Sequence, residues 1–130
     1  MSEPQSALLE LTGASGLKAA AMIHRDGTVL DRVHIGQEDE EVFSRATLIS
    51  LRFSESLGTY RDIREFVQMW IQFEGGLIVV HRVSADLMLF VVADEKAQIG
   101  MLRHRIQKAQ SELVKAYGEA APAEEENGFE

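Results

Sequence analysis

The four histidines of this chain, His24, His34, His81 and His104, are its best candidates for metal binding or proton transfer. No two of them are four residues apart, the spacing that would place a pair of ligands on one face of a helix. The sequence also contains no cysteine that could complete a metal site. Because a catalytic site needs polar partners that converge, we expect the histidines to be structural or solvent-exposed, with no bound metal and no cofactor.

Two other patterns could indicate a catalytic or phosphate-binding site, but neither matches the motif it resembles. The segment Gly13–Lys18 loosely resembles a phosphate-binding loop, but its spacing is wrong and it precedes a predicted strand instead of a helix. We interpret it as a loop between a helix and a strand. Ser15, Ser44 and Ser84 lack the sequence context of a nucleophile elbow. The sequence therefore predicts a protein that is not an enzyme.

The composition indicates one acidic domain. The chain has 130 residues, 45% of them apolar, and a net charge of −8, which fits a single domain with its own core. Residues 119–130 contain five glutamates and no basic residue, so we predict a domain over residues 1–118 and an acidic disordered tail over 119–130. This charge is unlike that of a nucleic-acid-binding protein. Because the chain shows no signal peptide and no membrane-length apolar run, we expect a cytoplasmic protein without membrane insertion.

Hydrophobic periodicity and turn residues predict eight elements in the order αββαβββα. Asp26-Gly27 and Gly75-Gly76 are turn signals of two hairpins, and Asp94 is the expected N-cap of the last helix, which Gly118 ends. The expected helices cover residues 5–11, 38–57 and 95–117, and the expected strands cover 17–24, 28–35, 63–73, 77–83 and 87–93. The short hairpins make the sheet mainly antiparallel, and both of its faces need helical cover, which predicts a three-layer sandwich.

The long helix, residues 38–57, has one apolar stripe and two leucines away from it. The stripe is expected to face the core and consists of Val42, Ala46, Ile49, Phe53 and Leu57. At 100° per residue, Leu48 and Leu51 point away from this stripe, near Arg45, Arg52 and Glu55. We interpret them as an interaction patch with a charged rim, and two scattered exposed leucines are the alternative.

The strand over residues 63–73 has one apolar face and a mixed face with Phe66 and Trp70. It lacks a later partner in the hairpin order, so we expect a sheet edge that could pair with a second copy of the chain. A compatible alternative places both aromatic residues under the last helix. The strand over 87–93 is apolar on both faces and is expected at the centre of the sheet. The basic cluster Arg103–Lys108 fits a solvated helix face, or else contact with an acidic partner.

Two segments resemble the Roadblock/dynein light chain family. Ala19–Leu30 is similar to its first hairpin, a strand of small residues followed by a basic-Asp-Gly turn and an apolar strand. Leu87–Asp94 followed by Ile99–Arg103 resembles the family's last strand and the start of its last helix, glycine included. The terminal part is similar to bacterial polarity regulators that act on Mgl-type GTPases.

The resemblance implies a profilin-like α+β fold, a three-layer sandwich with a five-stranded antiparallel sheet between one long helix and two helices. It also implies a homodimer, joined through the third strands and second helices, that binds a small Ras-like GTPase as a scaffold or as a regulator of its nucleotide state or location. The implied partner-binding residues are Arg45, Leu48 and Arg52. The expected dimer contacts are Leu48, Leu51, Glu55, Phe66, Gln68 and Trp70. The alternative function is a ligand-sensing domain of the PAS or profilin type, or a general protein-interaction module.

Overall fold

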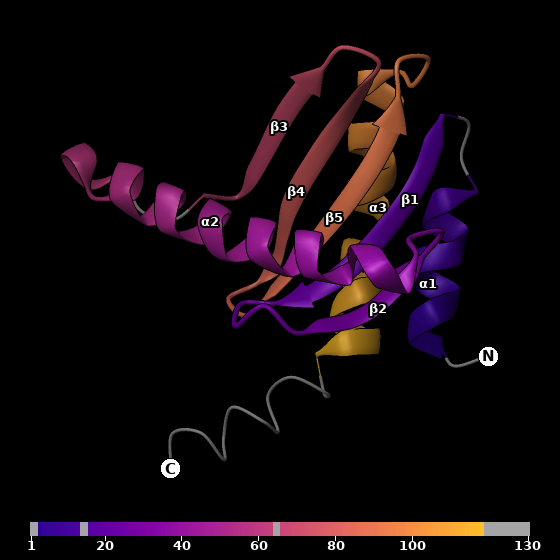
Figure 1. Ribbon diagram of the computed structural model, residues 1–130, viewed down its shortest axis with the longest axis horizontal. Helices are drawn as coiled ribbons and strands as arrows, with labels where there is room; N and C mark the ends of the chain where they lie inside the picture. Colours follow the sequence, from indigo (N-terminus) through magenta and orange to yellow (C-terminus); the bar gives the residue numbers. More distant parts are fainter. Residues whose placement is uncertain (1–2, 14–15, 64–65, 119–130) are drawn as a thin grey trace.

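The computed structural model describes residues 3–13, 16–63 and 66–118, so the predicted disordered tail lies outside the described residues. Its elements follow the predicted order (Figure 1). The helices are α1 (Glu3–Thr12), α2 (Glu40–Gly58) and α3 (Ile99–Tyr117), with short 3-10 helices at Gln37–Asp39 and Tyr60–Asp62. The strands are β1 (Leu17–His24), β2 (Val29–Val33), β3 (Gln68–Phe73), β4 (Gly76–Ser84) and β5 (Leu87–Asp94).

The five strands form one antiparallel sheet in the order β2-β1-β5-β4-β3. The prediction that the apolar strand β5 is central is confirmed, since β5 lies between β1 and β4. The prediction that the third strand is an edge is also confirmed. In register, Val91 of β5 faces Ala20 of β1 on one side and Val79 of β4 on the other, and all three side chains are buried.

The β1–β2 turn has the conformation that its Asp-Gly sequence predicts. Gly27 has a φ of 98°, a region that residues with a Cβ atom rarely adopt. A Cβ atom at this position would also lie 2.8 Å from Oγ of Ser44 on α2. Glycine at residue 27 therefore serves both the turn and the close approach of α2 to the hairpin.

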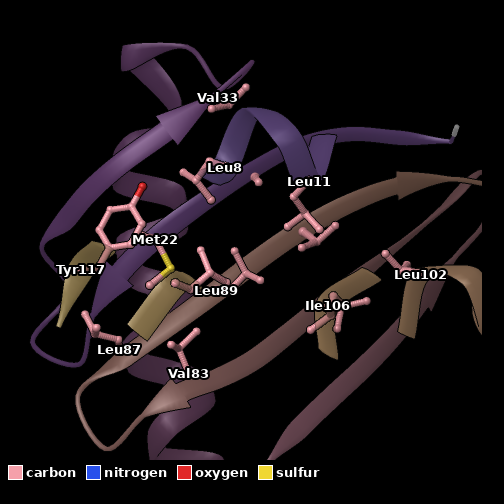
Figure 2. Packing of buried hydrophobic residues seen from close by; sticks show 14 of the residues in the cluster. Leu8, Leu11, Met22, Val33, Val83, Leu87, Leu89, Leu102, Ile106 and Tyr117 are labelled. Carbon is pink, nitrogen blue, oxygen red and sulfur yellow. The ribbon is translucent and has the colours of Figure 1, made fainter. Parts of the chain in front are cut away.

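The sheet lies between two helical layers, with α1 and α3 on one face and α2 on the other (Figure 1). Figure 2 shows the larger core cluster, in which Leu8 of α1 and Ile106 of α3 pack with Met22 of β1 and Leu89 of β5. A second cluster fills the space between the sheet and α2. Burial of this apolar surface on both faces is the main stabilising term of the fold. The predicted three-layer α+β fold is confirmed.

Two predicted boundaries were wrong. Asp94 does not cap α3 but is the last residue of β5, and its Oδ1 accepts a hydrogen bond from the backbone N–H of Lys96 at 2.8 Å. Gln98 is the N-cap residue of α3 instead. The strand expected from residue 63 begins at Gln68, and Ile63 instead has helical backbone angles as the residue that ends the 3-10 helix. An aspartate can stabilise a tight turn as well as a helix start, so its presence alone does not distinguish the two.

The face that α2 turns toward the sheet is not the predicted one. Leu51 is only 8% exposed, and the other buried residues of the helix are Thr47, Ser54 and Gly58. The hydroxyls of Thr47 and Ser54 donate to the carbonyls of Phe43 and Leu51, both at 2.9 Å, so their burial leaves no hydroxyl unpaired. The face of α2 toward the sheet thus consists of Leu51 and small residues.

The predicted core stripe therefore lies on the solvent side of α2. Val42, Ile49, Phe53 and Leu57 are between 53% and 61% exposed, and only Ala46 of the stripe packs against the core. The expectation that Leu51 points away from the core was wrong for the same reason. A helical repeat shows that residues share a face, but it does not show what covers that face.

Candidate interaction surface

The most unusual surface of the described structure is a row of large apolar side chains on α2. We call Val42, Ile49, Phe53 and Leu57 the α2 stripe. At 100° per residue they lie within an arc of about 80°, so they form one continuous row along the helix. Each of them is more than half exposed. Single exposed apolar residues are ordinary, but a contiguous row of this kind is typical of a protein-interaction site.

Part of the sheet beside α2 is also uncovered and apolar. Leu48 approaches Gly27, so α2 crosses the strands near the end that carries the β1–β2 turn, and the opposite end of that face has no described helix over it (Figure 1). Ile71 and Phe73 of β3 are 41% and 52% exposed there. Ile78 pairs with Ile71 in register and is half-buried. We call Ile71, Phe73 and Ile78 the β3 patch.

The α2 stripe and the β3 patch adjoin the same open edge. Phe53 and Leu57 lie about 140–180° around α2 from Leu48, so they occupy the flank that faces away from the β1–β2 turn. Within the described part of the chain, β3 pairs with β4 alone and leaves its outer edge without a strand partner. Figure 1 shows the C-terminal end of α2 extending past β3 on this side. A second molecule could therefore contact helix, sheet face and strand edge together.

The predicted partner-binding residues lie together on the other flank of α2. Arg45 is exposed, and its guanidinium pairs with the carboxylate of Glu41 one turn away at 2.7 Å. Leu48 is 44% exposed, and Arg52 is exposed one turn further on. Glu55 is exposed at the end of this flank. The helix thus has an apolar flank and a mixed flank, and both are accessible.

The remaining predicted dimer residues do not share one face. Phe66 packs in the α2-side cluster, and the guanidinium of Arg82 lies 4.9 Å from its ring centroid. Trp70 packs in the α1–α3 cluster, and the guanidinium of Arg103 lies 5.1 Å from its ring centroid. The alternative that both aromatic residues lie under the last helix is therefore confirmed for Trp70 and wrong for Phe66.

A chain of side-chain hydrogen bonds, for which no sequence pattern offered a signal, links β3 to α3. Trp70 Nε1 donates to Gln68 Oε1 at 2.7 Å, and Gln68 Nε2 lies 3.0 Å from His81 Nδ1. His81 Nε2 lies 2.7 Å from Gln110 Oε1, and Gln110 Nε2 donates to the carbonyl of Val83 at 2.7 Å. Because each glutamine uses its oxygen as an acceptor, the pattern assigns the proton of neutral His81 to Nε2. The buried imidazole is thus fully paired and holds the edge strand to α3.

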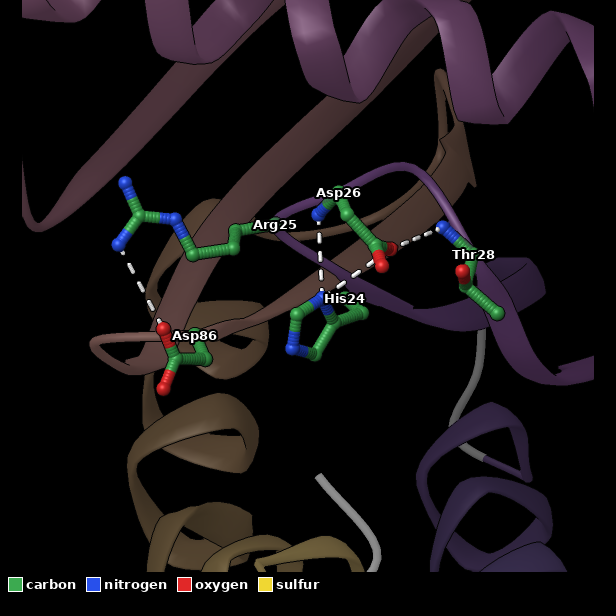
Figure 3. Close-up of polar contacts among 5 residues, drawn as sticks. All are labelled: His24, Arg25, Asp26, Thr28 and Asp86. Atoms are coloured by element: carbon green, nitrogen blue, oxygen red, sulfur yellow. Dashed lines mark hydrogen bonds and ion pairs between the residues drawn. The ribbon is translucent and has the colours of Figure 1, made fainter. Parts of the chain in front are cut away.

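A second polar cluster joins the β1–β2 turn to the β4–β5 turn (Figure 3). The backbone N–H of Asp26 donates to Nδ1 of the buried His24 at 3.1 Å, and Asp26 Oδ1 accepts from the N–H of Thr28 at 2.9 Å. Partial burial would raise the pKa of Asp26, but the hydrogen bonds from Thr28 and the nearby imidazole outweigh it and lower this pKa. Arg25 pairs with Asp86 across the two turns at 3.5 Å. These contacts hold the two turns together, and the β1–β2 turn lies close to Ser44 and Leu48 of α2.

The described residues offer little that could support catalysis. They contain no group of three or more His, Cys, Asp or Glu residues arranged to hold a metal ion. A cavity of about 440 Å³ lies between the end of α2 and the two turns, where Arg25, Glu55 and Arg82 line it. Arg82 is already engaged by the carbonyls of Phe66 and Ala85 at 3.1 and 3.0 Å. None of the described helices is long and apolar enough to span a membrane.

Comparison with known proteins identifies the family. Residues 5–93 match the Roadblock/LC7 domain. The chain belongs to the Roadblock/LC7 domain family. The predicted resemblance is thereby confirmed, over a segment that includes β1 to β4 and all but the last residue of β5, but not α3. No curated protein sequence matches the chain with significance.

Several solved structures share the fold at low sequence identity. MglB from Myxococcus xanthus is 19% identical with a TM-score of 0.82, and the match covers 90% of this chain and 96% of that one. The gliding protein MglB from Thermus thermophilus is also 19% identical, with a TM-score of 0.80 and 90% of each chain covered. Profilin from Schizosaccharomyces pombe is 13% identical with a TM-score of 0.59, over 85% of this chain and 96% of that one. The likeness to profilin agrees with the predicted profilin-like architecture.

Proposed function

We propose that this chain is a non-catalytic, cytoplasmic scaffold or regulator that forms a homodimer and binds a small Ras-like GTPase, influencing its nucleotide state or location. The domain responsible is residues 1–118. The observation that carries the proposal is the exposed α2 stripe beside the open edge of β3. Membership of the Roadblock/LC7 domain family supports it.

The exposed α2 stripe, the β3 patch and the open edge of β3 support the proposed homodimer. A two-fold axis beside β3 would pair the two β3 edges and continue the sheet from one protomer into the other. The end of α2 that extends past β3 would then carry Phe53 and Leu57 over the sheet of the second copy, toward its β3 patch. Such an arrangement removes an open strand edge and an apolar row from water at the same time.

The GTPase is assigned to the mixed flank of α2, which the dimer would leave open. Arg45, Leu48 and Arg52 lie on this flank, about 60° apart at most around the helix. Arginine and a central apolar residue are typical of the energetically important part of a protein interface. Two flanks of one helix would thus serve two partners, a second copy and a GTPase.

A titration against the Ras-like GTPases of the same genome, in both the GDP and the GTP state, tests the proposed partner. We expect saturable binding to at least one of them, and loss of that binding in Arg45→Glu/Arg52→Glu. The matched control is Lys18→Glu/Lys96→Glu, which reverses the same number of exposed charges away from α2. If no GTPase bound in either state, the GTPase assignment would be refuted, whereas the proposed homodimer would not be affected by this result.

A further inference from the structure

The flank of α3 that faces α1 carries cations without partners among the described residues. Arg105, Lys108 and Lys115 are exposed, and none of them forms an ion pair with any residue that the structure describes. By contrast, Arg25, Arg32 and Arg45 each pair with a carboxylate. In a chain with a net charge of −8, such a row of cations is a local exception that favours contact with an acidic group.

Arg105 and Lys108 also line a groove. A cavity of about 420 Å³ lies between α1 and α3, and Ala7, Leu11 and Ala109 supply its apolar part. The carboxylates of Glu10 and Glu112 line it as well, but neither lies within ion-pairing distance of a described cation. The groove is on the face of the sheet opposite α2, so it is separate from the proposed dimer surface (Figure 1).

The chain supplies the counter-charge itself, directly after α3. The hydroxyl of Tyr117 donates to Asp31 on β2 at 3.0 Å, which fixes the last turn of α3 and so the point from which the tail starts. The twelve residues after Gly118 carry five glutamates and no cation. Three of these glutamates are consecutive, at residues 124–126.

The lengths of helix and tail match. At 1.5 Å per residue, Lys108 and Arg105 lie about 15 and 20 Å back along α3 from Gly118. At about 3.3 Å per residue, residues 124–126 can reach at most about 20–26 Å from Gly118, so chain length alone permits contact with both cations. The intervening residues 120–123 are alanine and proline, which carry no charge past Lys115.

We propose that the acidic tail folds back along α3 of its own chain and docks Glu124–Glu126 in the α1–α3 groove, against Arg105 and Lys108. A tether of a few residues holds the carboxylates at a high effective concentration beside these cations, so individually weak pairs suffice. The docked tail covers the basic face of α3 and leaves α2 and β3 open. Acidic partners would have to compete with it for this groove.

Paramagnetic NMR of the full chain tests the docking. Because the sequence has no cysteine, Asn127→Cys provides a single site for a nitroxide label. We expect the label to broaden the amide signals near Arg105 and Lys108 most strongly, and we expect the broadening to disappear at about 1 M NaCl, where the screening length is ~3 Å. Amide chemical-shift dispersion reports in the same spectra that the domain remains folded.

Charge variants show whether the named residues are responsible. We expect at least a fivefold loss of paramagnetic broadening in Arg105→Gln/Lys108→Gln, and no loss in the control Lys18→Gln/Lys96→Gln, which removes two exposed cations elsewhere. Glu112→Gln should strengthen the broadening, since it removes a like charge from the groove. Broadening that is insensitive to salt, centred on another surface, or equally strong between differently labelled copies in a mixture would overturn the proposal.

Discussion

The orientation of α2 predicts a sharp difference between two aliphatic residues of the same helix. Leu51 is 8% exposed in the core between α2 and the sheet, whereas Ile49 is 61% exposed on the α2 stripe. Truncation of a buried leucine to alanine costs about 2–5 kcal/mol, since transfer free energy is lost and a cavity remains. We expect about 2–3 kcal/mol for Leu51→Ala, because its side chain keeps some exposure. Ile49→Ala should change the free energy of unfolding by only about 0.5 kcal/mol in the monomer.

Urea unfolding measured at low and high protein concentration separates the two effects. Leu51→Ala should lower the free energy of unfolding by the same amount at both concentrations, with an unchanged m value. The loss for Ile49→Ala should be near zero at the low concentration and should grow at the high one, because association stabilises the folded chain by mass action. If Ile49→Ala costs as much as Leu51→Ala at the lowest concentration, the stripe is core and α2 is turned the other way.

Three further predictions concern single contacts. Gln110→Leu should lower the free energy of unfolding by about 1–3 kcal/mol in urea, because it leaves the N–H of the buried His81 without an acceptor. Gly27→Ala should lower it by at least about 1 kcal/mol, because alanine is strained at a φ of 98°. The lowered pKa of Asp26 stabilises the fold above the ordinary value of 3.8, and this contribution disappears as the pH falls through the folded-state pKa. Asp26→Asn should therefore flatten the acid side of a plot of the urea midpoint against pH.

Matched variants test the first two predictions, and the acid limb itself tests the third. Gln107→Leu is an exposed change on the same helix and should leave the stability within about 0.5 kcal/mol of the parent chain. Gly100→Ala introduces the same methyl group as Gly27→Ala, but a Cβ there meets nothing within 4 Å in α3, so it should stabilise by about 0.5–1 kcal/mol. If Gln107→Leu lowered the free energy of unfolding as much as Gln110→Leu, the loss would not come from the unpaired His81 N–H. If Gly100→Ala lowered it as much as Gly27→Ala, the loss would not come from strain at residue 27. An acid limb unchanged in Asp26→Asn would show that the carboxylate of Asp26 is not stabilising.

Local signals in the sequence predicted the element order and the sheet correctly. The Asp26-Gly27 turn, the doubly apolar strand over 87–93 and the unpartnered third strand correspond to the observed hairpin, the central β5 and the edge β3. Each of these depends on neighbouring residues or on hairpin connectivity, which a sequence shows directly.

The orientation of α2 depends on contacts that the sequence does not show. The periodicity of the sequence identified the largest apolar stripe of α2. The residues that pack toward the sheet, however, are Leu51 and small residues such as Thr47 and Gly58. A stripe suited to a second molecule has the same repeat as one suited to the protein's own core. The hydrogen-bond chain from Trp70 to Gln110 was also beyond prediction, because its members come from three elements and meet only in the folded chain.

The central claim is that the α2 stripe and the β3 edge join two copies of this chain. Light scattering of the full chain at micromolar concentration, coupled to size-exclusion chromatography, measures this directly. We expect twice the 14.5 kDa mass of one chain, and a single-chain mass for Ile49→Glu/Phe53→Glu with an unchanged circular dichroism spectrum. Met101→Glu, a change at an exposed apolar residue of α3, should remain dimeric as the control. A single-chain mass for the unsubstituted protein, or a dimer that survives both charges on the stripe, would contradict this claim.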